Sequence, residues 1–147
     1  MFAVGLYQII PITLNDPDGG ISFLPWLDKY KKIDESTQKF NKEFQDLMPL
    51  FFWEAKRAII GEYFRGKTSV ENAAYAVSKE WASAGVPSGM KTEMKRISSG
   101  NVTYYDRRGL NKAHYSATKT IDALEKTKAM LDAYGGYDLI KAEGLSR

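Results

Sequence analysis

The chain opens with MFAVGLYQIIPITL, residues 1–14, an apolar run that carries several polar side chains at close spacing. Gly5 permits a backbone conformation that other residues avoid, or a close approach by a ligand. Tyr7 and Gln8 follow, and both side chains can hydrogen-bond a polar ligand. Pro11 suits the first turn of a helix, where its missing N–H costs nothing. The stretch therefore predicts a short extended segment that turns into a helix, with polar side chains at the turn.

The composition beyond this stretch is that of a globular chain with mild positive charge. Of the 147 residues, 44% are hydrophobic and 27% charged, and the formal net charge is +3. This length predicts one main domain over residues 1–134, followed by a polar tail over residues 135–147. The charge suits an anionic polymer partner such as cell wall or nucleic acid, without choosing between them.

Several classes of site are excluded by what the sequence lacks. It has no cysteine and one histidine, so we expect no disulfide, no thiolate nucleophile and no multi-histidine metal site. We accordingly expect no metal and no cofactor. No apolar run is long enough to span a membrane. The apolar N-terminus lacks the basic region and cleavage site of a signal peptide.

Hydrophobic spacing predicts a predominantly helical α+β fold. A short helix is expected around residues 25–31, and a longer apolar stripe runs over residues 35–59 after an N-cap at Asp34, with a kink or break at Pro49. The last helix should begin near Asn111 and end at Gly135 and Gly136. Together these segments indicate a helical core with a small extended region at the N-terminus.

The best-marked helix is expected over residues 68–84. Thr68 and Glu71 have the spacing of a capping box, and Trp81 ends the apolar stripe as a core anchor. Gly85 stands where a left-handed C-terminal cap would fall, and Pro87 prevents the helix from continuing.

Residues 86–110 form a long segment with three glycines and few aliphatic residues. Loops of this length inside compact domains are uncommon and often functional, although a mobile insertion explains the same pattern. Tyr104 and Tyr105 precede Arg107 and Arg108, and such aromatic and basic side chains stack on nucleic-acid bases or pack on sugar rings. The segment is therefore the main candidate for a binding loop.

Residues 3–13 resemble the Gly-x-(Tyr/Met)-Gln-(hydrophobic)₂-Pro-x-Thr signature of the lysozyme-like superfamily, in particular phage-lambda-type endolysins and prophage muramidases. Three further blocks follow in the order that these families show. They are DESTQ at residues 34–38, KEWASAGVP at residues 79–87, and the pair Tyr104-Tyr105 with GLNKA at residues 109–113. The resemblance covers roughly residues 3–120, and four blocks in order are far more specific than any one of them.

This resemblance implies a lysozyme-like fold and a peptidoglycan glycan strand as partner, with cleavage of the bond between N-acetylmuramic acid and N-acetylglucosamine as the ancestral reaction. It favours sugar over nucleic acid as the ligand of the aromatic side chains. It also implies synthesis in the bacterial cytoplasm and action at the periplasmic cell wall. The substrate-binding residues that it implies are Tyr7, Gln8, Tyr104, Tyr105, Asn111 and Lys112.

The sequence departs from this family at the catalytic acid. The family's general acid is a Glu on a helix upstream of the Gly-x-Tyr-Gln segment, and this sequence starts at Met1. Three readings stay open: a fragment, a degenerate protein that binds glycan or a protein partner, or a different carboxylate in the role. The acids near the matched blocks are Asp16, Asp18 and Asp106, all in turn-like contexts typical of solvated or capping carboxylates. No catalytic residue is assigned, and we expect weak or no cleavage.

Overall fold

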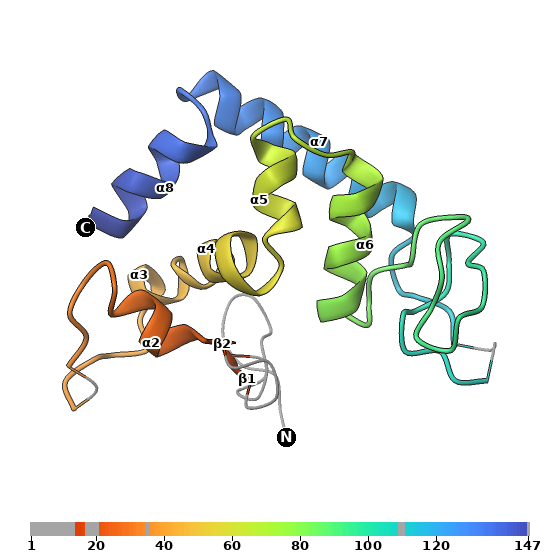
Figure 1. The fold of residues 1–147 in the computed structure, drawn as a ribbon, viewed down its shortest axis with the longest axis horizontal. Coiled ribbons are helices and arrows are strands. Elements are labelled where there is room, and N and C mark those ends of the chain that lie inside the picture. Colours follow the sequence, from red (N-terminus) through yellow and green to blue (C-terminus); the bar gives the residue numbers. More distant parts are fainter. Residues whose placement is uncertain (1–13, 17–20, 35, 109–110, 147) are drawn as a thin grey trace. The chain divides into compact units, whose positions relative to one another are not determined.

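The computed structural model describes residues 14–16, 21–34, 36–108 and 111–146 (Figure 1). It divides the chain into two compact units, unit 1 with residues 1–58 and 138–147, and unit 2 with residues 59–137. Helices make up most of the regular structure of the described residues, and a two-stranded sheet accompanies them. This confirms the predicted, predominantly helical α+β class.

Unit 1 is built on a small cluster of aromatic side chains. Phe51 contacts Phe23 and Trp26 with ring centres 5.6 Å apart in both pairs, and all three are buried. The elements that carry this core are β1 (Asn15–Asp16), antiparallel to β2 (Ile21–Ser22), then α2 (Phe23–Leu27), α3 (Lys42–Gln45), α4 (Met48–Phe51), the π-helix η1 (Phe52–Lys56) and α8 (Tyr137–Ser146).

The stripe over residues 35–59 is not one kinked helix. Asp34 was expected to cap it, but its carboxylate accepts from Ser36 N at 3.0 Å within a turn. Helical structure begins only at α3, where Asn41 Oδ1 accepts from Phe44 N at 3.0 Å. Pro49 lies in the first turn of α4 and separates it from α3, as a proline at that position should. The predicted break at Pro49 is confirmed, and most large side chains of the stripe are buried, although Phe40 and Ile59 are exposed. The late start of helical structure at α3 was not predicted.

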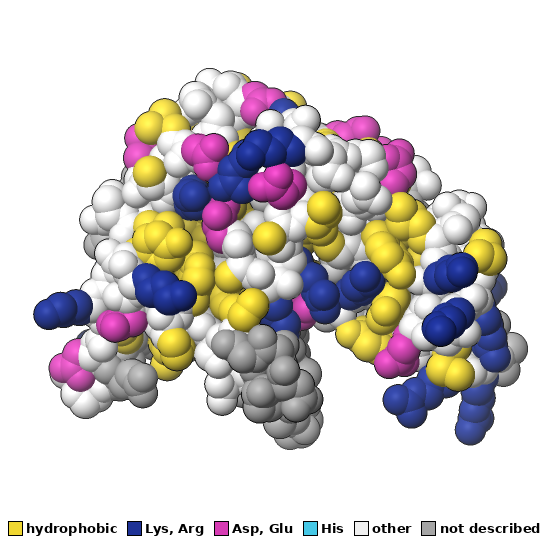
Figure 2. All heavy atoms as spheres, viewed as in Figure 1, with side chains coloured by type: hydrophobic (Ala, Val, Ile, Leu, Met, Phe, Trp, Pro, Cys, Tyr) yellow, Lys and Arg dark blue, Asp and Glu magenta, His cyan; other side chains and the backbone are white. Residues whose placement is uncertain are grey.

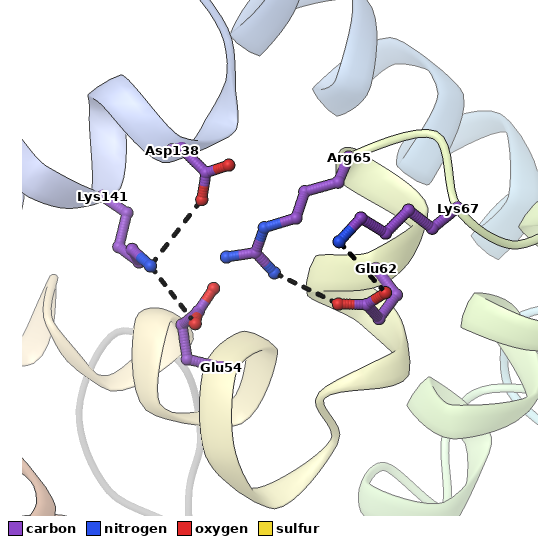
Figure 3. A network of polar contacts seen from close by, with 6 residues as sticks. All are labelled: Glu54, Glu62, Arg65, Lys67, Asp138 and Lys141. Atoms are coloured by element: carbon purple, nitrogen blue, oxygen red, sulfur yellow. Dashed lines mark hydrogen bonds and ion pairs between the residues drawn. The ribbon is translucent and has the colours of Figure 1, made fainter.

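Residues 137–146, which lie in the segment expected to be a polar tail, form α8. Leu145 is buried, and Lys141 Nζ lies 3.4 Å from Glu54 Oε2 and 3.7 Å from Asp138 Oδ1 (Figure 3). Both Glu54 and Lys141 are largely shielded from solvent, which strengthens their attraction. This ion pair and the buried leucine fix α8 within unit 1.

Unit 2 contains three helices and the long segment between the second and the third of them. α6 (Val70–Glu80) packs against α5 (Ile59–Phe64) and against α7 (Ala117–Ala133), as Figure 1 shows. Ala73, Ala74 and Ala76 are buried on α6, and their small side chains permit a close approach of the neighbouring helices. After α5, Arg65 pairs with Glu62 (Figure 3) and lies over the Tyr137 ring, 4.9 Å from its centre.

α6 is shorter than predicted at both ends. Ser69, not Thr68, is its N-cap and accepts from Asn72 N at 3.3 Å, whereas Thr68 Oγ1 accepts from the Asn72 side chain. The helix ends at Glu80, because Trp81 has an extended backbone. Trp81 is half-buried. The prediction that it anchors the core as the last residue of the helical stripe is therefore wrong.

α7 begins later than expected and ends as expected. Ser116 Oγ, not the Asn111 side chain, accepts from the first turn at Lys119 N. At the other end Gly135 and Gly136 both have φ near +100°, and Gly136 N donates to Leu131 O at 2.8 Å. Glycine suits this left-handed C-terminal geometry, so the predicted stop is confirmed.

Candidate functional site

The segment between α6 and α7, residues 81–116, folds into a body that we call the loop lobe. It contains no regular helix or strand among its described residues, yet short pairings close it on itself. Backbone bridges join Ala84 to Tyr115, Gly85 to Thr103, Lys91 to Ile97 and Val102 to Lys112. The described residues of the long binding loop expected from the sequence, 86–108, therefore form an ordered structure.

Gly85 lies where three backbone segments of the lobe cross. Its N–H donates to Tyr115 O at 2.8 Å, and nearby Ala117 N donates to Gly100 O at 2.8 Å. A Cβ on Gly85 would lie 2.6 Å from Gly100 O and 3.0 Å from Ala117 N. The expected role as a left-handed helix cap is wrong, since Gly85 is not among the residues with positive φ. Glycine is needed here for close approach.

Two buried polar side chains hold the loops of the lobe together. Ser98 Oγ donates to Val86 O at 2.6 Å and accepts from Gly100 N at 2.9 Å. Asp106 is 2% exposed, and its Oδ1 accepts from Arg108 N and Asn111 N, both at 3.2 Å. Of the carboxylates considered as replacement acids, Asp106 is thus a loop anchor. Asp16 lies in β1, and Asp18 lies outside the described residues.

A tyrosine cluster fastens the lobe to α6. The ring centres of Tyr75 and Tyr104 are 5.9 Å apart, and those of Tyr104 and Tyr105 are 5.2 Å apart. Tyr75 OH donates to Lys91 O at 2.7 Å, and Tyr105 OH donates to Lys79 O. Lys79 Nζ lies 4.1 Å from the centre of the Tyr75 ring. Burial raises the pKa of Tyr75 above its ordinary value, and Tyr104 raises that pKa further.

Four of the predicted binding residues belong to this lobe. Thr103 N donates to Asn111 O at 3.2 Å, and the Val102–Lys112 bridge is next to that bond, so residues 102–105 and 111–112 lie together. Tyr105 is 43% exposed, Tyr104 is half-buried, and Asn111 and Lys112 are exposed. Tyr7 and Gln8 lie outside the described residues, so their role in substrate binding stays a prediction.

The loop lobe has a larger net positive charge than the chain as a whole. Its six basic residues against two acidic ones give a formal charge of +4, which leaves −1 for the rest of a chain of net charge +3. Within the described residues none of the six has an ion-pair partner, and basic side chains crowd over the lobe at the right of Figure 2. They are Lys91, Lys95, Arg96, Arg107, Arg108 and Lys112.

The net charge of the loop lobe was not predicted from the sequence, because its basic residues do not form one run. A charge balance taken over the segment between the two best-marked helices would have found it.

Among the residues that the structure describes, no group of three or more His, Cys, Asp or Glu side chains is arranged to hold a metal ion. The same residues include no helix that is both long and apolar enough to cross a membrane.

Comparison of the chain with protein-family models, curated proteins and solved structures gave no match.

Proposed function

We propose that this chain is a lysozyme-like, peptidoglycan-targeting domain of a phage or prophage, and that its loop lobe binds the glycan strand of the cell wall. The observation that carries the proposal is the meeting of Tyr104, Tyr105, Asn111 and Lys112 on one ordered, basic lobe. These residues come from the sequence blocks that resemble the prophage muramidases.

The chemistry of the lobe suits a carbohydrate that also bears carboxylates. Tyrosine rings pack against the C–H faces of sugars, and Tyr105 is exposed enough to offer part of its ring. Asn111 and Lys112 supply hydrogen-bonding groups beside it, and a few placed polar groups are what orients a ligand in such sites. Peptidoglycan carries free carboxylates on its stem peptides, so a lobe of charge +4 attracts it at long range.

The lobe is also held in place before any ligand arrives. Backbone bridges, the buried Ser98 hydroxyl and the Asp106 carboxylate fix the loops that carry the binding residues. A site that is ordered in advance loses less conformational entropy on binding. This rigidity favours a recognition surface over a mobile insertion.

The proposal assigns binding and no catalytic residue. Asp106, the buried carboxylate of the lobe, is occupied by backbone N–H groups, whereas a glycosidase acid has to reach the leaving oxygen. Cleavage of the bond between N-acetylmuramic acid and N-acetylglucosamine is proposed as the ancestral reaction. A general acid typically contributes a factor on the order of 10²–10⁴, so cleavage by this chain should be slow at best.

Co-sedimentation with purified peptidoglycan tests the proposal. Tyr105→Ala should weaken binding by roughly two- to tenfold, because aromatic contacts contribute about 0.5–1.5 kcal/mol beyond their buried area. Tyr105→Phe keeps the ring and should bind nearly as well as wild type, which separates ring packing from the hydroxyl bond to Lys79. Lys112→Ala should bind more weakly, whereas Lys126→Ala, an exposed lysine of α7, serves as the control.

Two results would contradict the proposal. One is unchanged sedimentation of Tyr105→Ala when circular dichroism shows the same fold as wild type. The other is complete displacement from peptidoglycan by single-stranded DNA at equal charge concentration, which would assign the basic and aromatic lobe to nucleic acid. Release of soluble muropeptides during the same assay measures any residual cleavage.

A further inference from the structure

A second feature of the loop lobe lies on its hairpin at residues 89–98. The hairpin tip, residues 91–97, exposes two large apolar side chains, Met94 at 53% and Ile97 at 64%. The same tip carries Lys91, Lys95 and Arg96 and one acidic residue, Glu93, so its formal charge is +2. None of the three basic residues has an ion-pair partner among the residues that the structure describes. Two large exposed apolar side chains on one short basic tip make it a candidate interaction site.

Met94 and Ile97 are exposed although hydrogen bonds hold the backbone of the hairpin in place. Thr92 is buried, its N–H donates to Arg96 O at 2.9 Å, and its Oγ1 accepts from Arg96 N at 3.3 Å. Ser98 N donates to Met90 O at 2.8 Å, and a bridge pairs Lys91 with Ile97. Tyr75 OH, by its bond to Lys91 O, fastens the hairpin to α6. The tip is a fixed projection that presents Met94 and Ile97 outward.

The backbone at the tip also favours a role for the Lys95 side chain. Lys95 has φ of 59°, in the left-handed region. Glycine adopts this conformation without steric strain, whereas the Cβ of any other residue is strained there. A lysine at this turn therefore lowers the stability of the hairpin relative to glycine. Strained positions of this kind are often functional.

We propose that the hairpin tip docks onto an anionic lipid surface. Met94 and Ile97 would enter the boundary between headgroups and acyl chains, while Lys91, Lys95 and Arg96 contact headgroup phosphates. Charge complementarity explains the cations, and basic segments are drawn to anionic leaflets in this way. The two apolar side chains select lipid over a polysaccharide or nucleic-acid backbone, because only a bilayer offers them an apolar phase.

This inference goes beyond the proposed function and rests on different side chains. The wall-binding residues are Tyr104, Tyr105, Asn111 and Lys112, whereas the lipid-binding residues lie at 91–97. Vesicles contain no peptidoglycan, so each activity can be assayed alone. Tyr105→Ala should keep vesicle binding, and the Met94→Ser/Ile97→Ser variant, which leaves the charge of the lobe unchanged, should keep binding to peptidoglycan.

The experiment sediments the full chain with vesicles of equal parts phosphatidylglycerol and phosphatidylcholine, and with vesicles of phosphatidylcholine alone. We expect binding to the anionic vesicles only. The double variant Met94→Ser/Ile97→Ser should bind at least tenfold more weakly. Met130→Ser removes a side chain of α7 that is also 64% exposed, and it should bind like wild type.

Lys95→Gly separates lipid contact from a role in folding. This variant should melt no lower than wild type, because glycine relieves the left-handed backbone, yet its vesicle affinity should fall roughly fivefold, the effect expected of one basic residue near an anionic surface. A lysine with a merely structural role would give the opposite pattern, with lower stability and unchanged binding.

A fluorescent label reports insertion directly. Because the chain has no cysteine, Ile97→Cys and Met130→Cys each provide a single site for an environment-sensitive dye. The emission of the dye at residue 97 should shift to shorter wavelength with anionic vesicles, and that of the dye at residue 130 should not. Equal binding to neutral vesicles, unchanged binding of the Met94→Ser/Ile97→Ser variant, or no emission shift at residue 97 would overturn the proposal.

Discussion

Replacement of Gly85 by alanine should loosen the loop lobe while leaving the helices intact. A Cβ at this position meets Gly100 O at 2.6 Å, Ala117 N at 3.0 Å and Tyr115 O at 3.1 Å. All three are backbone atoms, so no side-chain rotation can relieve the contact. The backbone segments must move apart instead.

The cost follows from what this movement disturbs. Overpacking of a tight site typically costs about 1–3 kcal/mol. The same shift lengthens the bonds Gly85 N–Tyr115 O and Ala117 N–Gly100 O, both 2.8 Å, and each contributes about 1 kcal/mol. Gly85→Ala should therefore lower the free energy of unfolding by about 2–4 kcal/mol. For a chain of this size that corresponds to a Tm lower by roughly 5–15 °C.

Thermal melting by circular dichroism measures this change, and hydrogen exchange at the amides of Gly85 and Ala117 locates it. Gly144→Ala is the matched control, because its Cβ would meet only the flexible Leu50 Cδ1, at 3.2 Å, and alanine favours the helical backbone of α8. The control should melt within about 1 kcal/mol of wild type. Coincident melting curves for Gly85→Ala and wild type would refute the crossing geometry of the lobe.

Three further predictions concern single side chains. The pKa of Tyr75 is raised in the native state, so the folded chain keeps a proton that the unfolded chain loses near the ordinary tyrosine pKa of about 10. The free energy of unfolding should therefore fall as the pH rises above about 10. Urea titrations at several pH values should show a smaller fall for Tyr75→Phe than for wild type. Asp106→Ala should destabilise the lobe by about 2–3 kcal/mol and weaken peptidoglycan binding, since it leaves the amides of residues 108 and 111 without that acceptor, and unchanged melting would contradict this. Lys141→Met should cost about 1–2 kcal/mol by removing the ammonium group beside the largely shielded Glu54 carboxylate. The Glu54→Gln/Lys141→Met pair should cost less than the sum of its single variants in a double-mutant cycle.

In unit 2, α6 and α7 were largely predictable because their signals are local, whereas α5 begins where the predicted stripe over residues 35–59 ends and was not predicted. Alanine and valine spacing marks α6, and the Gly135-Gly136 pair marks the end of α7. The exact first residues were harder, since neighbouring residues compete as caps. Thr68 and Ser69 are both good N-caps, and only the position of the Asn72 N–H in the folded chain decides between them.

The interior of the loop lobe was not predictable in this way. Gly85, Gly100 and Tyr115 meet through pairings between residues far apart in sequence, and no spacing rule on one segment reports them. Asp106 had the turn context that favours a carboxylate bonded to backbone amides, so its anchoring role agrees with that expectation. The candidate binding residues were found by motif resemblance, and the structure adds that residues 104–105 and 111–112 are neighbours.

The anchors of the lobe explain how it tolerates its charge. Six basic side chains without ion-pair partners in the described structure repel one another, and such repulsion disfavours a compact state. The forces that oppose it are the backbone crossings at Gly85, the Ser98 hydroxyl bonds and the Tyr75 bond to Lys91, all uncharged, with Asp106 as a buried acidic anchor. Because these basic side chains form no ion pairs within the described structure, they remain available to a partner. A lobe stabilised mainly by ion pairs would have lost that capacity, so its division into mostly uncharged anchors and free basic side chains favours a surface that recognises anions.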